Sequence, residues 1–295
     1  MTGVNTEGAA ARPRTAVNES GPERSLGITR SWVAGDDVVT SMATGPWLNG
    51  PAGSPPGGVL GVVIDDVLGF AIARHGGMTH WTVSAEISLD LTGPVPADGS
   101  RIEARARHVH SGPHGGLSAG TVHDGSGALI ALCRQHGRWV TTMPENFVPP
   151  REGATTADGE AAFVAAMPAG AAGPWSPPAS LTALLGARLQ PAEGGTALDL
   201  DVTQDLTNPL GNLHGGITFA ACDLAAQAAL LAVGGPTQTA SIHVAYPRPM
   251  PLGTTPRFEA RVLHHGRSLG IVRVTATLDG VKPCAVATIT TGVPG

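Results

Sequence analysis

A histidine followed by two glycines, His214-Gly215-Gly216, separates a turn-rich stretch from a long apolar run. The run from Ile217 to Val233 has the length of a helix, so the glycines are expected in its first turn. Backbone N–H groups lack intrahelical partners there, and they carry the positive end of the helix dipole. This arrangement suits the binding of a polarised oxygen.

A carboxylate follows inside the same run. Asp223 lies nine residues after His214, among Ala, Leu and Cys. Asn208 lies six residues before His214. A lone ionised group in apolar surroundings is unfavourable unless it is compensated, so a chemical role is the leading explanation for Asp223. Structural roles stay open: a hydrogen bond from His214 to its own loop, tight packing at the glycines, a satisfied carboxylate at Asp223, and a simple turn at Asn208.

The composition narrows the class of protein. Aromatic residues are only 4% of the chain while 42% is apolar, so Ala, Val, Leu and Ile must build the core. A formal net charge of −5 disfavours partners such as nucleic acid or an anionic membrane. No uninterrupted apolar run reaches the roughly 18 to 20 residues of a membrane span. The cysteines lie far apart in apolar runs, which favours a reducing, cytoplasmic location.

The order of predicted elements divides the chain into two similar halves. Residues 1–25 are expected to be a disordered tail, 26–142 a first domain, 143–174 a Pro/Gly/Ala-rich linker, and 175–295 a second domain. The first domain is predicted to hold a helix over Val59–His75 and then strands near 81–90, 101–110, 117–123 and 128–135. After the linker the same order returns, with strands near 197–202, 240–246, 257–264, 269–278 and 285–291.

Residue matches between the halves support an internal repeat. Arg101-Ile102-Glu103-Ala104-Arg105 corresponds to Arg257-Phe258-Glu259-Ala260-Arg261. Pro56-Gly57-Gly58 and Asp65 repeat the His-Gly-Gly and aspartate at the same nine-residue offset, and Asn49 corresponds to Asn208 with one inserted residue. Each half therefore predicts an antiparallel sheet wrapped around one helix, an α+β fold, and the two halves could pair as a fused pseudo-dimer.

The spacing of Asn208, His214-Gly215-Gly216 and Asp223 resembles the hot-dog-fold acyl-CoA thioesterases of the phenylacetate-degradation type. Ser241 lies where such enzymes carry a Ser or Thr that positions water or the carboxylate. The resemblance covers both halves and implies a double hot-dog protein. It implies hydrolysis of a thioester, with a glycine N–H at the helix start as oxyanion donor and an aspartate as base or nucleophile. No cofactor is implied.

In that family the donor and the carboxylate come from opposite subunits, which here means opposite halves. The resemblance thus implies one site that joins Asn208, His214, Gly215 and Gly216 to Asp65, and a second that joins Asn49 and Gly57 to Asp223 and Ser241. Pro56 replaces the family histidine in the second site, which puts that site in doubt. In the first site the counterpart of Ser241 is either Ser84 or Glu86, and Asp65 is favoured over Asp66 by its offset.

Other functions remain as alternatives. The segment from Asp205 to Leu210 partly resembles the motif of R-specific enoyl-CoA hydratases, but an inserted residue and the late His214 would misplace their Asp/His pair. A non-catalytic acyl-CoA-binding module is the third hypothesis. The histidines do not form a metal-binding pattern, so no metal is expected. Acyl-CoA is the expected partner, with acyl carrier protein as another handle, and homo-oligomerisation is possible.

Overall fold

The computed structural model describes residues 21–29, 31–75, 80–142 and 177–292. The first half contains, in chain order, α1 (Gly21–Ser25), β1 (Trp32–Ala34), β2 (Asp37–Ala43), η1 (Pro46–Leu48), η2 (Gly57–Leu60), α2 (Gly61–His75), β3 (Trp81–Leu91), β4 (Arg101–Gly112), β5 (Gly115–His123) and β6 (Leu129–Val140). The second half contains α4 (Leu181–Leu185), β7 (Arg188–Ala192), β8 (Gly195–Asp199), η3 (Gln204–Leu206), α5 (Gly215–Ala232), β9 (Gln238–Ala245), β10 (Arg257–His265), β11 (Leu269–Thr277) and β12 (Pro283–Gly292).

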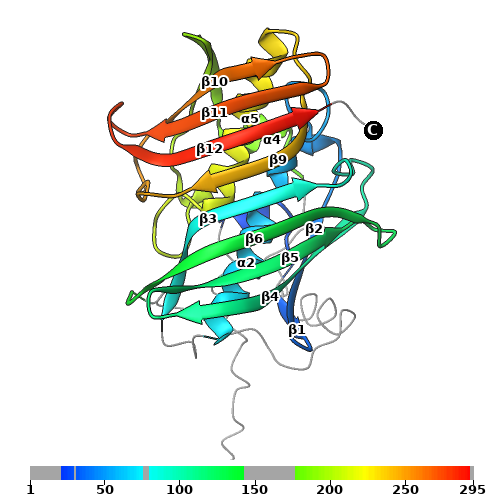
Figure 1. Cartoon of the computed structure of the whole chain (residues 1–295), viewed down its shortest axis with the longest axis vertical. Helices are drawn as coiled ribbons and strands as arrows, with labels where there is room; N and C mark the ends of the chain where they lie inside the picture. Colours follow the sequence, from blue (N-terminus) through cyan, green and yellow to red (C-terminus); the bar gives the residue numbers. More distant parts are fainter. Residues whose placement is uncertain (1–20, 30, 76–79, 143–176, 293–295) are drawn as a thin grey trace, which may run out of the picture.

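The twelve strands of the described residues form one antiparallel sheet in the order β1-β2-β4-β5-β6-β3-β9-β12-β11-β10-β8-β7. The halves meet at its centre, where β3 pairs with β9 and Leu89 lies opposite Ile242 (Figure 1). Each half thereby covers the edge strand that the other would expose. The two halves of this antiparallel sheet, each wrapped on one long helix, confirm the predicted α+β double hot-dog fold.

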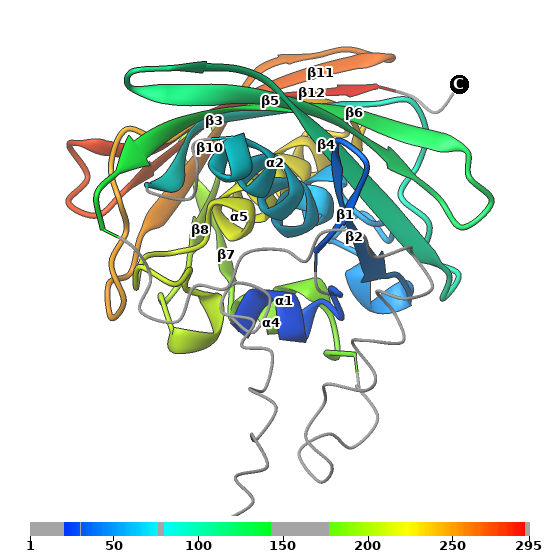
Figure 2. The same ribbon diagram turned by 90° about the horizontal axis from the view of Figure 1, so that it is seen from below.

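The two long helices lie side by side on the concave face of this sheet (Figure 2). α2 packs on strands of the first half, α5 packs on strands of the second, and the two helices contact each other. Both are apolar on nearly all sides because one side meets the sheet and the other meets the partner helix. Their junction brings the two halves together at the starts of the helices.

α5 is long and apolar enough to cross a membrane by length and composition, with a mean hydropathy of 1.4. However, 78% of it is buried inside the protein, and it carries Asp223. It is therefore the core helix of the second half. Such a helix passes the same length and hydropathy test as a membrane span.

One boundary predicted from the sequence is wrong. Residues 21–25 were assigned to a disordered tail, but they form α1, and Gly21, Pro22 and Glu23 are buried. The helix packs against η3 of the other half. A five-residue helix has no periodicity to detect, and only its tertiary contacts hold it in place. Residues 1–20 and the predicted linker, 143–174, lie outside the described residues.

Candidate active site

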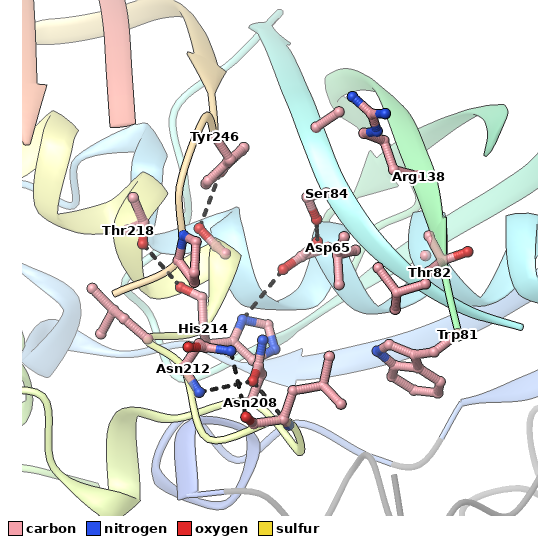
Figure 3. Close-up of a pocket in the computed structure, with 18 of the residues that line it drawn as sticks. Asp65, Trp81, Thr82, Ser84, Arg138, Asn208, Asn212, His214, Thr218 and Tyr246 are labelled. Carbon is pink, nitrogen blue, oxygen red and sulfur yellow. Dashed lines mark hydrogen bonds and ion pairs between the residues drawn. The ribbon is translucent and has the colours of Figure 1, made fainter. Parts of the chain in front are cut away.

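A cavity of about 830 Å³ opens between the two halves. The first half lines it from α2, β3 and β6, and the second half lines it from the loop before α5, the start of α5 and the loop after β9 (Figure 3). The polar residues around it are Asp65, Asp66, Thr82, Ser84, Gln135, Arg138, Thr142, Asn208, Asn212, His214, Thr218, Tyr246 and Arg248. Phe70 and Trp81 also line this cavity and meet edge to face, with ring centroids 6.3 Å apart.

Asp65 is fixed at the wall of the cavity by groups from both halves. Ser84 Oγ donates to its Oδ1 over 2.6 Å, and the backbone N–H of Gly216 donates to its Oδ2 over 3.1 Å. The bond from Ser84 settles the ambiguous alignment, because Glu86 instead contacts His136 on a more exposed part of the sheet. Gln135, buried on β6, donates in turn to Ser84 Oγ over 2.8 Å. Carboxylate, hydroxyl and amide thus form a chain with one defined geometry.

Gly215 lies directly against this carboxylate. A Cβ at this position would lie 2.6 Å from Asp65 Oδ2, so any larger residue would displace this carboxylate. Its carbonyl accepts a hydrogen bond from Tyr246 Oη at 3.0 Å, which holds the peptide in place. In the part of the chain that the structure describes, the N–H of Gly215 has no hydrogen-bond partner, as expected at a helix start.

Gly216 was predicted to bind substrate, and the geometry corrects this. Its N–H points to Asp65 and to His214 Nδ1, and the residue does not line the cavity. Asn208 does line the cavity, but its Oδ1 accepts from the backbone N–H groups of Leu210 and Asn212 and so builds the turn that carries the loop. The turn-forming role of Asn208 is therefore present whether or not the side chain also contacts substrate.

His214 is buried among acidic groups. Its Nδ1 lies 3.3 Å from Asp65 Oδ2, and its Nε2 lies 3.7 Å from both Glu23 Oε1 and Asp66 Oδ1. Burial alone would lower the pKa of His214, but the three carboxylates outweigh it and raise the pKa to about 9. Burial raises the pKa of Asp66 to about 6, although His214 opposes this shift.

Glu23, Asp66 and His214 are also the one group of histidine and carboxylate ligands within 4.8 Å of one another in the described ranges. Their spacing is compatible with a cation. However, the raised pKa of His214 favours a protonated imidazole, whose nitrogens have no lone pair left for a metal.

The second predicted site has the same framework but is closed. Asp223 Oδ2 accepts from the N–H of Gly58 over 2.8 Å and from Thr239 Oγ1 over 2.8 Å. Asp223 is fully buried, and burial raises its pKa to about 6. The N–H of Gly57, the predicted donor, is taken by Thr239 Oγ1 at 3.1 Å. None of Asn49, Gly57, Asp223 and Ser241 lines the cavity.

Two assignments in this second site need correction. The hydroxyl that contacts Asp223 belongs to Thr239 rather than to Ser241, which lies two residues later in β9 opposite Thr290 and Asp90. Ambiguity in aligning the turn between helix and strand caused the error. Asn49 ends η1, and its buried Oδ1 has no partner in the described structure, so it does not reproduce the turn that Asn208 makes.

Sequence reasoning missed Gln135, Tyr246 and Glu23. For Gln135 a signal existed, because it occupies a core position of a strand whose alternate residues Cys133 and Gly137 are buried. A polar residue there requires a partner. Tyr246 is the single tyrosine of the chain, but its partner is a backbone carbonyl, which no sequence pattern reveals. No pattern in the sequence indicated a role for Glu23.

Comparison with known proteins agrees with this geometry. Residues 203–292 match the acyl-CoA thioesterase N-terminal domain, and residues 10–139 match the acyl-CoA thioesterase C-terminal domain. The chain belongs to the acyl-CoA thioesterase family. The two thioesterase domains occur here in the reverse of the order that their names indicate.

Individual relatives support the family and the fold to different extents. Human acyl-coenzyme A thioesterase 13 is 32% identical over 88 residues, which are 29% of this chain and 63% of that protein. The matched segment thus spans just under two thirds of that relative. A putative thioesterase from Novosphingobium aromaticivorans has a TM-score of 0.57 at 16% identity, over 90% of this chain and 98% of its own. The tesB protein of Mycobacterium avium subs paratuberculosis also has a TM-score of 0.57, at 13% identity, over 92% and 98% of the two chains.

Proposed function

We propose that this protein hydrolyses acyl-CoA thioesters to a carboxylic acid and CoA at the cavity that contains Asp65. The observation that carries the proposal is the position of Asp65 Oδ2 beside Gly215, whose N–H is unpartnered in the described structure. A thioester carbonyl placed between them would have the Asp65 carboxylate on one side, as a general base or as a nucleophile. On the other side it would have an N–H donor at the start of α5, where developing negative charge is stabilised.

Two routes use the same atoms. Asp65 can remove a proton from water, which attacks the carbonyl and expels the CoA thiolate, or Asp65 can attack directly and form an anhydride that water then cleaves. Appearance of ¹⁸O in Asp65 after single-turnover hydrolysis in H₂¹⁸O would identify direct attack. Direct attack with water cleaving at the aspartyl carbonyl places ¹⁸O in Asp65, whereas general-base attack places it only in the product acid.

The decisive experiment measures thiol release from short, medium, long and aromatic acyl-CoAs by the wild type, Asp65→Asn, Asp223→Asn and the double variant. We expect Asp65→Asn to abolish release and Asp223→Asn to retain it, because Asp223 is fully buried and its donor glycine is occupied. Loss only with Asp223→Asn would reverse the assignment of the sites. A wild type that binds acyl-CoA but releases no thiol would refute hydrolysis and favour a binding module.

The hydratase alternative receives no support from the site. Asp205, which would supply its aspartate, has a side chain 76% exposed on η3 and does not line the cavity. The imidazole of His214 instead lies against Asp65, Asp66 and Glu23. Incubation with crotonyl-CoA should therefore give no hydration product under conditions in which thiol release is measurable.

CoA rather than acyl carrier protein is the proposed carrier of the acyl group. Arg138 and Arg248 line the same cavity and could contact phosphates of the nucleotide. The substitution Arg138→Ala should then raise KM for an acyl-CoA several-fold and leave KM for the matching acyl-pantetheine unchanged. Equal effects on both substrates would argue against a contact with the nucleotide.

Three further proposals concern the internal duplication, the location and the assembly of the protein. Corresponding aspartates accept from glycines of opposite halves, at Gly216 and Gly58, which supports an internal duplication. We further propose a cytoplasmic location, which fits three free and buried cysteines. Assembly of the fused pseudo-dimer into a larger homo-oligomer stays a prediction for light scattering.

A further inference from the structure

The cluster beneath the active site joins three parts of the chain that are far apart in sequence. Glu23 comes from α1, Asp66 from α2, and His214 from the residue before α5. They are respectively 0%, 4% and 4% exposed. Both carboxylates approach the same imidazole nitrogen, Nε2, at 3.7 Å. The opposite nitrogen of the ring lies against Asp65.

The position of α1 is fixed by a close backbone contact. A Cβ on Gly21 would lie 2.2 Å from Asp205 Cα in η3, so the helix can approach η3 only because residue 21 is glycine. The adjoining Leu206 accepts a backbone hydrogen bond from His214 over 2.9 Å. Helix α1, η3 and His214 therefore form one connected unit, and Glu23 reaches the ring from a defined place.

A proton on His214 Nδ1 decides what holds Asp65. The neutral tautomer that keeps this proton would turn a bare Nε2 toward Glu23 and Asp66 at 3.7 Å. A neutral ring with a bare Nδ1 can accept the N–H of Gly216 at 3.0 Å, but its lone pair then faces Asp65 Oδ2 at 3.3 Å. A protonated ring donates from Nδ1 to Asp65, while the N–H of Gly216 donates to the same oxygen. Among the described residues, the titratable groups that face the ring are Glu23, Asp65 and Asp66, all acidic. Buried charges of one sign require such a counter-charge.

We propose that Glu23 is a positioning residue: together with Asp66 it keeps His214 protonated, and the imidazolium holds Asp65 against the glycines at the start of α5. The role in catalysis rests on the proposed hydrolase, but the electrostatic relationship does not. The N-terminal helix thus completes the active site although it lies outside the sheet and the two long helices.

The first test is the titration of His214 by ¹⁵N NMR of histidine-labelled protein, with the signal assigned by its loss in His214→Gln. The substitution Glu23→Gln removes one negative charge with little change in shape, so the midpoint should fall by roughly 1 pH unit. Glu23→Asp keeps the charge, so its His214 midpoint should stay closer to that of the wild type. Arg24→Gln is the matched control, since that side chain on the same helix is 66% exposed, and it should leave the midpoint unchanged.

The second test is the pH profile of thiol release. In the wild type kcat should fall as pH rises through about 9, where His214 loses its proton. Glu23→Gln should move this limb to lower pH and reduce kcat roughly threefold at pH 8.5, with KM unchanged within about twofold. Gly21→Ala, which displaces α1 but keeps the charge, should shift the limb in the same direction.

An unchanged imidazole midpoint in folded Glu23→Gln would overturn the proposal. So would a loss of kcat with no movement of the basic limb, because that pattern indicates a merely structural contact. The NMR midpoint needs no substrate. A protein that releases no thiol would therefore refute the hydrolase while leaving this electrostatic test intact.

Discussion

Ser84 and Thr239 make the same hydrogen bond in the two halves of the protein. Ser84 Oγ donates to Asp65 over 2.6 Å, and Thr239 Oγ1 donates to Asp223 over 2.8 Å. The difference lies in what else the hydroxyl does. Thr239 also accepts the N–H of Gly57, whereas Ser84 accepts from Gln135 and leaves the N–H of Gly215 without a partner in the described structure. One site thus retains an N–H donor without a partner in the described structure, and the other uses its donor internally.

Ser84→Ala should lower kcat about 10- to 100-fold, because a hydrogen bond to a charged group contributes roughly 1.5 to 3 kcal/mol. Thiol release under saturating acyl-CoA measures this. Ser84→Thr, which restores a hydroxyl of the kind present in the other half, should recover most of the rate. Ser88→Ala is the control, because Ser88 bonds to His243 away from the cavity. Full activity of Ser84→Ala would remove the hydroxyl from the mechanism.

Gln135→Met should lower kcat by a smaller factor, about 3- to 10-fold, since a neutral hydrogen bond contributes roughly 1 kcal/mol. The buried Oε1 of Gln135 has no partner in the described structure, so its removal should not lower the melting temperature. Steady-state kinetics and thermal unfolding of the same sample measure both quantities. A stability loss without a rate effect would make Gln135 a packing residue only.

Gly215→Ala and Gly57→Ala form a matched pair. The first places a methyl group 2.6 Å from Asp65 Oδ2, and we expect a loss of activity of about 100-fold or more with a folded protein. The second places it 2.6 Å from Leu91 Cδ1, so overpacking should lower stability by about 1 to 3 kcal/mol. Thiol release at a temperature where both variants are folded separates them. Equal activity of the two would contradict a single working site.

Asp223→Asn should stabilise the protein above pH 6. Because burial raises the pKa of Asp223 to about 6, the folded state binds a proton more tightly than the unfolded chain, and ionisation destabilises the fold as pH rises from about 4 to 6. The neutral amide of Asp223→Asn avoids this destabilisation. The free energy of unfolding should therefore rise by up to about 3 kcal/mol at pH 8 and by much less at pH 4. The amide oxygen can still accept from Gly58 and Thr239. Urea unfolding at both pH values measures the difference, and equal effects at both would contradict a buried carboxylate.

The linear sequence determined the fold and half of the site. Apolar runs too long for strands predicted both core helices, and alternating segments predicted most of the strands. The repeated nine-residue offset singled out Asp65, and the family resemblance then implied its pairing with His214-Gly215-Gly216 of the other half. These patterns can be recognised in the linear sequence because helix and strand periodicities, and glycine at a helix start, are local properties of the chain.

Only the tertiary structure decided which site is open and what surrounds it. Thr239 takes over from Ser241 because the register of β9 depends on strand pairing rather than on local sequence. Asp65 lines a cavity while Asp223 is sealed, although both follow the same motif. Glu23 reaches His214 from 191 positions away along the sequence. Burial and contacts between distant segments are properties of the packed molecule, and a single sequence carries no direct record of them.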